Sequence, residues 1–482
     1  MKIALASSEI FPFAKTGGLA DVAGALGKYL SKQKIDIRMF TPLYSATDFS
    51  VSTFYPVDFL QDMEMWFADR KIVYSVHTAK LPDSNTDVYF ISCPELFNRW
   101  SIYTEDPDEF LRFAVLNRAT LEICQRMGWA PDIIHCNDWQ TALIPLYLKT
   151  TYKWDTLFKN TRTVLSIHNI GYQGLFSTYI IGALGFQDYL HLLDSYDLKS
   201  NLFNFLKLGV IHADWLSTVS KTYAHEIQTA EYGAGMEAML SYRKYILTGI
   251  VNGVDYDEWD PQTDKYIPFK FSLKAPSGKQ KNKKYLLEKI GFQYNEKTPL
   301  IGVVSRLVEQ KGFDLIIAVL ENIINYNDVQ FVILGSGHHR YEQFFQYMAD
   351  KYPNKLAFFT GYNNELSHLI EAGSDMFLMP SRYEPCGLNQ IYSLKYGTIP
   401  IVRKTGGLAD TVELYQWETQ TGTGFVFEDY SEQGLEWALN YAIETFSYPE
   451  AWNKIVKNAM SMNYSWTIQV KEYIKMYKNI LK

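Results

Sequence analysis

The same seven residues occur twice in the sequence, and this repeat constrains the fold more than any other feature. Lys-Thr-Gly-Gly-Leu-Ala-Asp stands at 15–21 and again at 404–410. Each copy follows a short apolar, strand-like run, at 2–6 and 399–402, and precedes a helical pattern. An identity of this length is not expected by chance, so the repeat predicts two strand, turn and helix units of one kind.

The repeated turn is suited to an anionic ligand. Paired glycines let a backbone approach a ligand closely, and the free N–H groups of a helix N-terminus favour negative charge. For either copy alone, a tight turn that merely requires glycine is the alternative. Because both copies also keep their lysine, we expect two anion-binding turns, one in each domain.

Short apolar runs alternate with longer helical patterns along the whole chain. The first series of runs lies at 2–6, 35–40, 88–91, 133–136 and 163–167, and helical segments such as 19–30 and 109–127 separate them. Further runs lie at 246–251, 300–304, 329–334, 375–379 and 399–402. This alternation indicates parallel βαβ units, so we predict an α/β protein with two doubly wound, Rossmann-like domains. The turn-rich stretch 252–261 places the boundary near Tyr256, which gives domains 1–256 and 257–465.

Composition argues against several classes of function. A net charge of −7 argues against a general nucleic-acid binder or a protein of anionic membranes, and no apolar run approaches the roughly 18 residues of a membrane span. The four cysteines show no metal-ligand spacing and favour a reducing compartment. The strand pattern begins directly after Met1, so we expect no targeting peptide. Aromatic residues make up 16% of the chain; most will be core, but such rings also stack on sugars.

The informative motifs all follow predicted strands, where open α/β sheets bind their ligands. In the first domain they are His-Cys-Asn-Asp-Trp at 135–139 and Ser-Ile-His-Asn-Ile-Gly at 166–171. In the second they are Ser-Arg-Leu-Val-Glu-Gln-Lys-Gly at 305–312, Gly-Ser-Gly at 335–337 and Ser-Arg-Tyr-Glu-Pro-Cys-Gly-Leu at 381–388. Five motifs at the edges of two sheets predict one ligand site in each domain.

Arg306 and Lys311 resemble a clamp for a diphosphate, with Lys404 in the same domain. Arginine offers a planar fork of donors and lysine a point charge, so a leaving group's charge would be stabilised without a metal. Surface salt bridges are the alternative. Glu384 lies in a constrained loop, and His168 could donate to a sugar hydroxyl; for both, a satisfied structural polar group is the alternative.

One short pattern suggests a metal site. Asp-Tyr-Asp at 255–257 matches the Asp-x-Asp pattern by which some glycosyltransferases bind a divalent cation. Its position at the predicted domain junction favours a structural turn, so no metal site is predicted there.

As a set, these motifs resemble the bacterial glycogen synthase and plant starch synthase family, the ADP-glucose-dependent α-1,4-glucan synthases. The resemblance spans essentially the whole chain and implies the GT-B architecture, in which two Rossmann-like domains face a cleft and a C-terminal helix, here about 466–482, packs back on the first domain. It implies transfer of glucose from ADP-glucose to the non-reducing end of an α-1,4-glucan with retention and without a metal or other cofactor. The resemblance also implies a cytoplasmic location, or the plastid stroma or starch granule if this is a mature plastid form.

Matching motifs carry the family's site residues onto this chain. Catalytic roles are implied for His168, Glu384, Arg306, Lys311 and Asp138. Nucleotide-sugar binding is implied for Lys15, Gly18, Asp21, Asn252, Gly335, Tyr362, Cys386, Gly387, Leu388, Thr405, Gly406 and Gly407. Acceptor binding is implied for Phe97, Trp139 and Asn169, with the Trp139 ring stacked on glucan. Without an enzymic nucleophile, retention suggests front-face attack, in which positioning and electrostatics do most of the catalysis.

Three positions depart from the wider pattern, and three alternatives remain. Tyr392 stands where many retaining relatives have a second glutamate, as in the synthase branch; Gln140 replaces a histidine, and Trp100 replaces a glycine. The alternatives are a relative that uses UDP-glucose, a catalytically weak glucan-binding scaffold, and an α-glucan phosphorylase. The presence of Lys15, Arg306, Lys311 and Glu384 argues against a scaffold, and no lysine motif for pyridoxal phosphate is evident.

Overall fold

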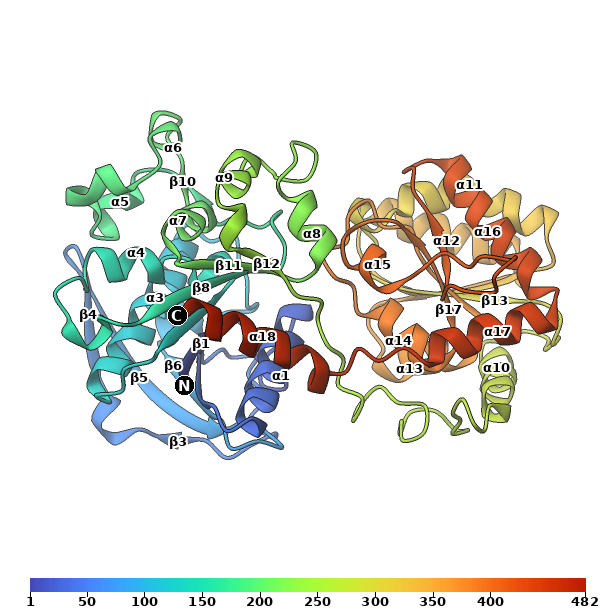
Figure 1. Cartoon of the computed structure of the whole chain (residues 1–482), viewed down its shortest axis with the longest axis horizontal. Helices are drawn as coiled ribbons and strands as arrows, with labels where there is room; N and C mark the ends of the chain where they lie inside the picture. The colour runs from blue at the N-terminus through green and yellow to red at the C-terminus, as the bar shows by residue number, and fades with distance from the viewer. The chain divides into compact units, whose positions relative to one another are not determined.

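The computed structural model describes all residues, Met1–Lys482, and the chain divides into two compact units (Figure 1). The first unit comprises Met1–Val219, Ala224–Gly253 and Trp466–Lys482, and the second comprises Ser220–Tyr223 and Val254–Ser465. The main segment of the second unit thus begins at Val254, two residues before the predicted boundary at Tyr256. No helix is both long and apolar enough to span a membrane.

A ten-stranded sheet forms the centre of the first unit. Its order is β12-β11-β8-β7-β1-β2-β6-β5-β3, and β4 pairs with β5. The parallel strands are β1 (Lys2–Ala6), β2 (Asp36–Pro42), β6 (Asp87–Ser92), β7 (Ile133–Asn137), β8 (Arg162–Ile167), β11 (Trp215–Thr218) and β12 (Leu247–Gly249). The antiparallel strands at one end are β3 (Tyr55–Pro56), β4 (Met63–Phe67) and β5 (Arg70–Lys80). A separate small ribbon pairs β9 (Leu175–Phe176) with β10 (Phe203–Asn204).

Helices of the first unit connect these strands. They are α1 (Gly18–Lys32), α2 (Pro94–Phe97), α3 (Glu109–Arg126), α4 (Ile144–Lys149), α5 (Ile180–Ala183), α6 (Ser195–Lys199), α7 (Phe205–His212), α9 (Glu237–Tyr242) and α18 (Trp466–Ile480), and α8 (Lys221–Glu226) begins in the second unit. The buried faces of α1 and α18 pack in one core with Ile3 and Leu5 of β1.

The second unit is built on six parallel strands. Their order is β15 (Leu356–Thr360), β14 (Gln330–Gly335), β13 (Leu300–Val304), β16 (Met376–Met379), β17 (Ile399–Arg403) and β18 (Phe425–Phe427). Numbered along the chain, this is the order 3-2-1-4-5-6 of the Rossmann fold. Its helices are α10 (Ser277–Lys289), α11 (Phe313–Tyr326), α12 (His339–Lys351), α13 (Asn364–Gly373), α14 (Asn389–Tyr396), α15 (Gly406–Thr411), α16 (Glu432–Phe446) and α17 (Pro449–Met460). The predicted class, two doubly wound α/β domains, is confirmed.

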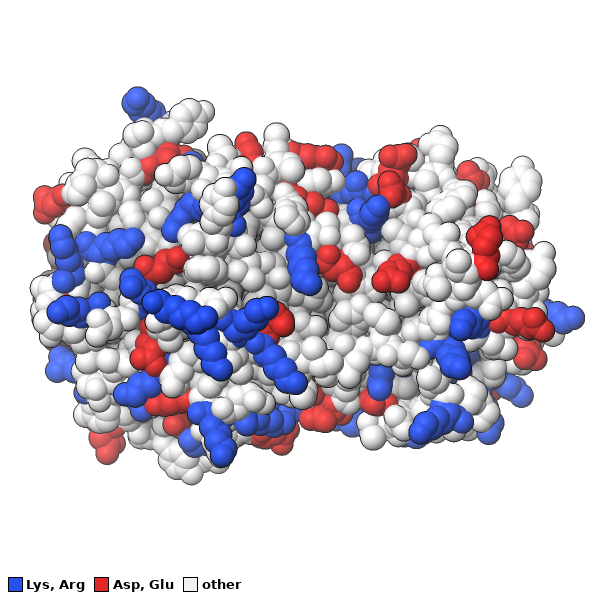
Figure 2. All heavy atoms as spheres, viewed as in Figure 1, with Lys and Arg blue, Asp and Glu red and all other residues white.

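The last helix, α18, returns to the first unit and is fixed there by a buried polar contact. The hydroxyl of Tyr477 lies 2.7 Å from Nδ1 of His135, whose Nε2 lies 2.6 Å from the hydroxyl of Ser166. Burial lowers the pKa of His135 to about 3. The opposite face of α18 exposes lysines, and Figure 2 shows a group of basic side chains where Figure 1 draws this helix.

Two features of the sheets were not predicted. The antiparallel strands β3 to β5 were missed, because their alternating burial gives no continuous apolar run. The run at 246–251 was counted with the later strands, yet β12 pairs with β11 at the edge of the first sheet. Strand pairing of this kind is decided by tertiary contacts and not by local pattern.

Candidate active site

Each sheet has a point where the strand order reverses, and the predicted motifs follow the strands that flank it. In the first sheet β1 lies between β2 and β7, and in the second β13 lies between β14 and β16. The chain leaves β1 towards β2 and β7 towards β8, and in the second sheet it leaves β13 towards β14 and β16 towards β17. Because the connections from each of these two neighbouring strands run in opposite directions, a ligand crevice forms at the carboxyl ends of the pair. Most candidate site residues follow the strands at or next to these two points, β1, β7 and β8 in the first domain and β13, β16 and β17 in the second, whereas Phe97, Asn252, Gly335 and Tyr362 lie elsewhere.

The first glycine turn surrounds an acidic side chain of the protein itself. The backbone N–H groups of Thr16 and Gly17 both donate to Oε2 of Glu9, the latter at 3.2 Å, and the Thr16 hydroxyl donates to Oε1 at 2.8 Å. Glu9 is 2% exposed, and Tyr103 also donates to its Oε1, at 2.5 Å. Sequence analysis missed both Glu9 and Tyr103; the only signal for Glu9 was its place between β1 and the glycine turn.

The outer side of this turn is open. A β-carbon built on Gly17 would meet no atom within 4 Å. Lys15 pairs with Asp21 of the same motif at 2.7 Å, and Gly18 begins α1. The face of the first turn that was predicted to bind a ligand is thus accessible at Gly17, although the N–H groups of Thr16 and Gly17 already donate to the Glu9 carboxylate.

Asp138 joins the ends of β7 and β8. Its backbone is left-handed, with φ 55°, and its N–H donates to the carbonyl of Ser166 at 2.9 Å. Its Oδ1 accepts the backbone N–H of His168 at 2.7 Å. Burial raises the pKa of Asp138 to about 7, against the opposing effect of the backbone hydrogen bonds from His168 and Asn169. The carboxyl group is therefore positioned firmly and titrates near neutral pH.

His168 is set up as an acceptor and not as the donor that was expected. Asn137 donates its amide Nδ2 to the carbonyl of Ala6 at 3.0 Å, so its Oδ1 must accept from Nε2 of His168, 2.9 Å away. Burial lowers the pKa of His168 to about 4, so the ring is neutral. With the proton on Nε2, the remaining nitrogen, Nδ1, can only accept a hydrogen bond.

Two residues predicted to bind the acceptor are core residues instead. The Trp139 ring is 8% exposed, because it packs against the rings of Phe113, Phe176 and Phe205. Phe97 is fully buried. Neither ring has a free face for a sugar, so the prediction of stacking on Trp139 and contact through Phe97 is wrong.

The other acceptor positions differ in exposure. Asn169 is partly exposed, and its Oδ1 accepts the N–H of Gly171 at 3.0 Å, which closes a turn beside Asp138. Gln140 is 6% exposed, and its carbonyl accepts from Asn117 at 2.7 Å. Gln140, one of the three positions that depart from the family pattern, is therefore a buried core residue.

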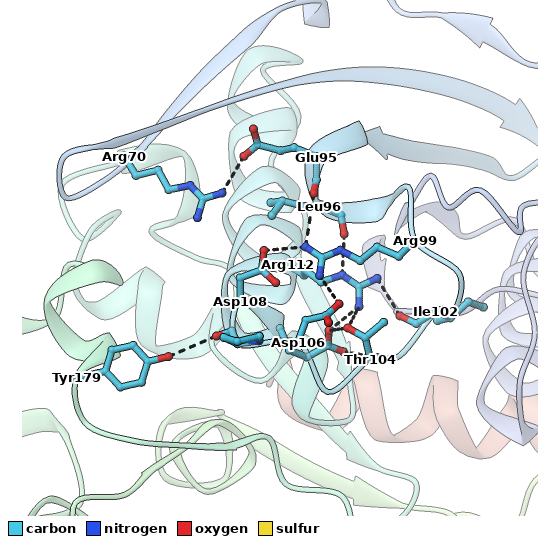
Figure 3. A network of polar contacts seen from close by, with 12 residues as sticks. Arg70, Glu95, Leu96, Arg99, Ile102, Thr104, Asp106, Asp108, Arg112 and Tyr179 are labelled. Atoms are coloured by element: carbon cyan, nitrogen blue, oxygen red, sulfur yellow. Dashed lines mark hydrogen bonds and ion pairs between the residues drawn. The ribbon is translucent and has the colours of Figure 1, made fainter.

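Trp100 follows Arg99 in a loop that two arginines hold in place, and Figure 3 shows the polar contacts of Arg99 and Arg112. Arg112 is fully buried and donates to the carbonyl of Ile102 at 3.0 Å, while Arg99 pairs with Asp108 at 2.7 Å. The hydrogen bond to Asp108 is the main reason that the pKa of Arg99 is raised. The loop presents Trp100 with 86% of its surface exposed.

In the second domain the repeated glycines serve a close approach between two loops. A β-carbon on Gly406, where φ is 42°, would lie 2.0 Å from the carbonyl oxygen of Glu384, and one on Gly407 would lie 2.1 Å from that of Cys386. The N–H of Gly407 donates to the Glu384 carbonyl at 3.1 Å. The second turn therefore needs glycine to dock on the loop that follows β16, and Thr405 is its N-cap residue.

The lysine and aspartate of the second copy have partners outside the motif. Lys404 pairs with Glu428 at 2.5 Å, and both side chains are exposed. Asp410 accepts from the hydroxyl of Thr222 at 2.6 Å and from the N–H of Lys221 at 2.5 Å, at the start of α8. Identical sequences thus have different surroundings in the two domains.

Lys311 and Glu384 form a largely buried ion pair at the second switch point. Nζ of Lys311 lies 2.6 Å from Oε2 of Glu384, and the Ser381 hydroxyl donates to the same oxygen at 3.0 Å. Gly312 allows this approach, since a β-carbon there would lie 2.0 Å from the carbonyl oxygen of Pro380. Arg306 is exposed, and its guanidinium has no partner in the chain. Arg306 therefore does not form the surface salt bridge that was the alternative to a diphosphate clamp.

The remaining nucleotide-side positions lie on several loops. Gly335 ends β14, where a β-carbon would lie 2.0 Å from the carbonyl oxygen of Ser305. Tyr362 is 84% exposed, and Cys386 is buried. Gly387 has φ 72°, and Leu388 is the N-cap residue of α14. Asn252 belongs to the first unit, where its buried Oδ1 has no hydrogen-bond partner.

Two other sequence features have structural roles. Oδ1 of Asp255 accepts the N–H of Asp257 at 3.1 Å, so the Asp-Tyr-Asp pattern closes a turn. Tyr392, which stands in the place of a second glutamate, stacks on Trp259 with ring centroids 3.9 Å apart. Trp259 stacks in turn on His368 at 3.7 Å.

Comparison with protein families matches both domains. Residues 2–242 match the starch synthase catalytic domain family, and residues 288–459 match the group 1 glycosyl transferases. The glycogen synthase of Koribacter versatilis is 43% identical, with 99% of this chain and 98% of the relative covered. That of Thermotoga maritima is 41% identical, with 100% and 99% covered.

Solved structures agree with these matches. The catalytic domain of starch synthase IV from Arabidopsis thaliana, bound to ADP and acarbose, superimposes with a TM-score of 0.90 at 32% identity, over 100% of this chain and 99% of that one. Sucrose-phosphate synthase from Thermosynechococcus elongatus shares the fold at a TM-score of 0.60 and 15% identity, over 99% and 98%. The predicted GT-B class is thereby confirmed, and the chain belongs to the glycogen synthase and starch synthase family of glycosyltransferases.

Proposed function

We propose that this glycosyltransferase transfers glucose from ADP-glucose to the non-reducing end of an α-1,4-glucan, with retention of the anomeric configuration. The observation that carries the donor side is the group after β13 and β16: the unpartnered guanidinium of Arg306 and the ion pair between Lys311 and Glu384. The Arabidopsis starch synthase, solved with ADP and acarbose, supports a nucleoside diphosphate and a glucan as the ligands of this chain too.

On the donor side, the two cations would bind the diphosphate and stabilise the charge that develops on the leaving ADP. The planar fork of Arg306 matches phosphate oxygens, and each charged hydrogen bond contributes about 1.5 to 3 kcal/mol. Glu384 holds the Lys311 ammonium at 2.6 Å, so this charge is positioned before the substrate arrives. We propose that no metal or other cofactor takes part.

In the first domain, the neutral His168 would accept a hydrogen bond from a hydroxyl of the transferred glucose through Nδ1. Asp138, with a pKa of about 7, would favour the positive charge that develops on the sugar when it is ionised. The incoming glucan hydroxyl attacks from the face that the phosphate leaves, and a leaving phosphate oxygen takes the hydroxyl proton. A new C–O bond replaces the broken one on the same face, which is retention.

The test is incorporation of labelled glucose into a glycogen primer from ADP-glucose and, in parallel, from UDP-glucose, with EDTA present. Incorporation from ADP-glucose alone, released again by an enzyme specific for α-1,4 linkages, is the expected result. Incorporation from UDP-glucose alone would make the protein a UDP-glucose-using relative. Loss of activity in EDTA would overturn metal independence, and no incorporation from either donor would favour a glucan-binding scaffold.

A further inference from the structure

A cavity of about 300 Å³ lies in the first domain, outside the candidate active site. Its walls come from the C-terminal end of α3, from β4, and from the segment that follows α4, which includes Trp154. The volume is at the lower end for small-molecule sites. Its size therefore suits a short part of a larger ligand.

The cavity lies at the opposite edge of the sheet from Asp138 and His168. Helix α3 leads into β7, so the C-terminal end of α3 lies near the amino end of that strand. Likewise, the segment after α4 leads into the amino end of β8. Asp138 and His168 follow the carboxyl ends of the same two strands. A ligand in the cavity would thus leave the candidate active site free.

The floor of the cavity is a network of satisfied polar groups. Oε1 of Glu122 accepts from the hydroxyl of Tyr152 at 2.6 Å, and Oε2 accepts from that of Tyr74 at 3.0 Å. Arg118 donates to the same Tyr152 hydroxyl at 3.2 Å and to the carbonyl of Trp66 at 2.6 Å. These contacts order the lining before any ligand binds, which lowers the entropic cost of binding.

The rim offers groups that have no partner within the chain. The Arg126 guanidinium and the Thr151 hydroxyl make no hydrogen bond within the chain, and the Trp154 indole is 74% exposed. Two glutamates and two arginines line the cavity, so its charge is balanced and favours neither an anion nor a cation. A neutral ligand with many hydroxyl groups and an apolar ring face fits this lining, because indole rings pack on such faces.

We propose that this cavity binds an α-1,4-glucan at a second site, with Trp154 stacked on a sugar ring and Arg126 bound to its hydroxyls. The inference rests on the proposed function, which makes a glucan the polymer that this protein extends. A second site holds the polymer while its chain ends react at the other edge of the sheet. It would also give a role to Trp154, an aromatic residue that is exposed and not packed in the core.

Affinity electrophoresis through gels with and without glycogen tests the proposal, together with initial rates on glycogen and on maltotriose. Trp154→Ala and Arg126→Ala are the variants, and Tyr326→Ala, 85% exposed in the second domain, is the matched control. We expect both variants to weaken retention by glycogen about fivefold and to raise KM for glycogen. Rates on maltotriose and thermal melting should remain those of the wild type, as should all properties of Tyr326→Ala.

The outcomes separate this inference from the proposed function. If the wild type transfers glucose and is retained by glycogen but Trp154→Ala is retained equally, the second site is refuted and the function stands. Equal retention of the wild type by dextran would refute selectivity for an α-1,4-glucan. If the wild type neither transfers glucose nor binds glycogen, the proposed function fails, and the second site fails with it.

Discussion

In the second domain, Nζ of Lys311 lies 2.6 Å from Oε2 of Glu384, and the two side chains are 19% and 7% exposed. The pair links the segment after β13 to the segment after β16, the two strands at which the sheet's order reverses. A buried charge that loses its partner is strongly destabilised, so each residue depends on the other for its position. Loss of Glu384 would therefore destabilise the segment after β16 and also displace the Lys311 ammonium that we propose binds a diphosphate.

Replacing Glu384 tests its place in the reaction. We expect Glu384→Ala to lower kcat at least about 100-fold, on the scale of one lost preorganised electrostatic contact. Glu384→Gln keeps the shape but removes the charge that holds Lys311. Glu309→Gln is the matched control, because Glu309 forms an exposed ion pair with Arg382. Turnover of Glu384→Ala near that of the control would remove Glu384 from the mechanism.

Arg306 should affect activity without affecting stability. Its guanidinium is exposed and unpartnered, so Arg306→Ala should leave the melting temperature unchanged. Loss of one charged hydrogen bond to phosphate should lower kcat/KM for ADP-glucose about 10- to 100-fold. Arg306→Lys should restore only part of this, because an ammonium lacks the planar fork. An unchanged kcat/KM in Arg306→Ala would argue against the diphosphate clamp; Lys297→Ala, also exposed, is the control.

The two copies of the glycine turn should respond differently to the same substitution. Gly407→Ala places a β-carbon 2.1 Å from the Cys386 carbonyl oxygen, so overpacking should cost about 1 to 3 kcal/mol of unfolding free energy. Gly17→Ala meets no atom within 4 Å and should change stability by less than about 0.5 kcal/mol, while raising KM for ADP-glucose. Chemical denaturation of both variants checks this, and equal losses of stability would contradict it.

Asp138 should make stability depend on pH. Burial raises its pKa from the ordinary 3.8 to about 7, so between these values the folded chain keeps a proton that the unfolded chain has lost. Its contribution to stability therefore falls as the pH rises through this window, by at most about 4 kcal/mol. Asp138→Asn does not titrate, and its melting temperature should rise relative to the wild type between pH 5 and pH 8. A difference that does not change with pH would refute the raised pKa.

Tyr477 should anchor the last helix. Tyr477→Phe removes the hydroxyl that lies 2.7 Å from Nδ1 of the fully buried His135, and leaves that nitrogen without a partner. The expected loss is about 1 to 3 kcal/mol of unfolding free energy, measured by chemical denaturation. Tyr326→Phe removes a hydroxyl at the surface and should be neutral. Equal stability of the two variants would show that the contact to His135 carries no net energy.

Much of the candidate site could be predicted because each polar motif lies at the carboxyl end of a predicted strand. Hydrophobic runs at 2–6, 133–136, 163–167 and 300–304 became β1, β7, β8 and β13, so residues that follow them had to lie at the carboxyl edges of the sheets. This placed Asp138, His168, Arg306 and Lys311 without knowledge of any contact. The role of each side chain was less predictable, since Nε2 of His168 is committed to Asn137 and only Nδ1, an acceptor, is left where a donor was expected.

The sequence by itself determined the α/β class, the two glycine turns and the strand ends that carry the polar motifs, because local periodicity and turn chemistry act within a few residues. Tertiary structure alone decided which rings are buried, as for Trp139 and Phe97, and which anion occupies the first turn. It also decided that the same heptad is open to solvent at Gly17 and packed against the Cys386 backbone at Gly407. Such outcomes depend on atoms distant in sequence, which no local pattern records.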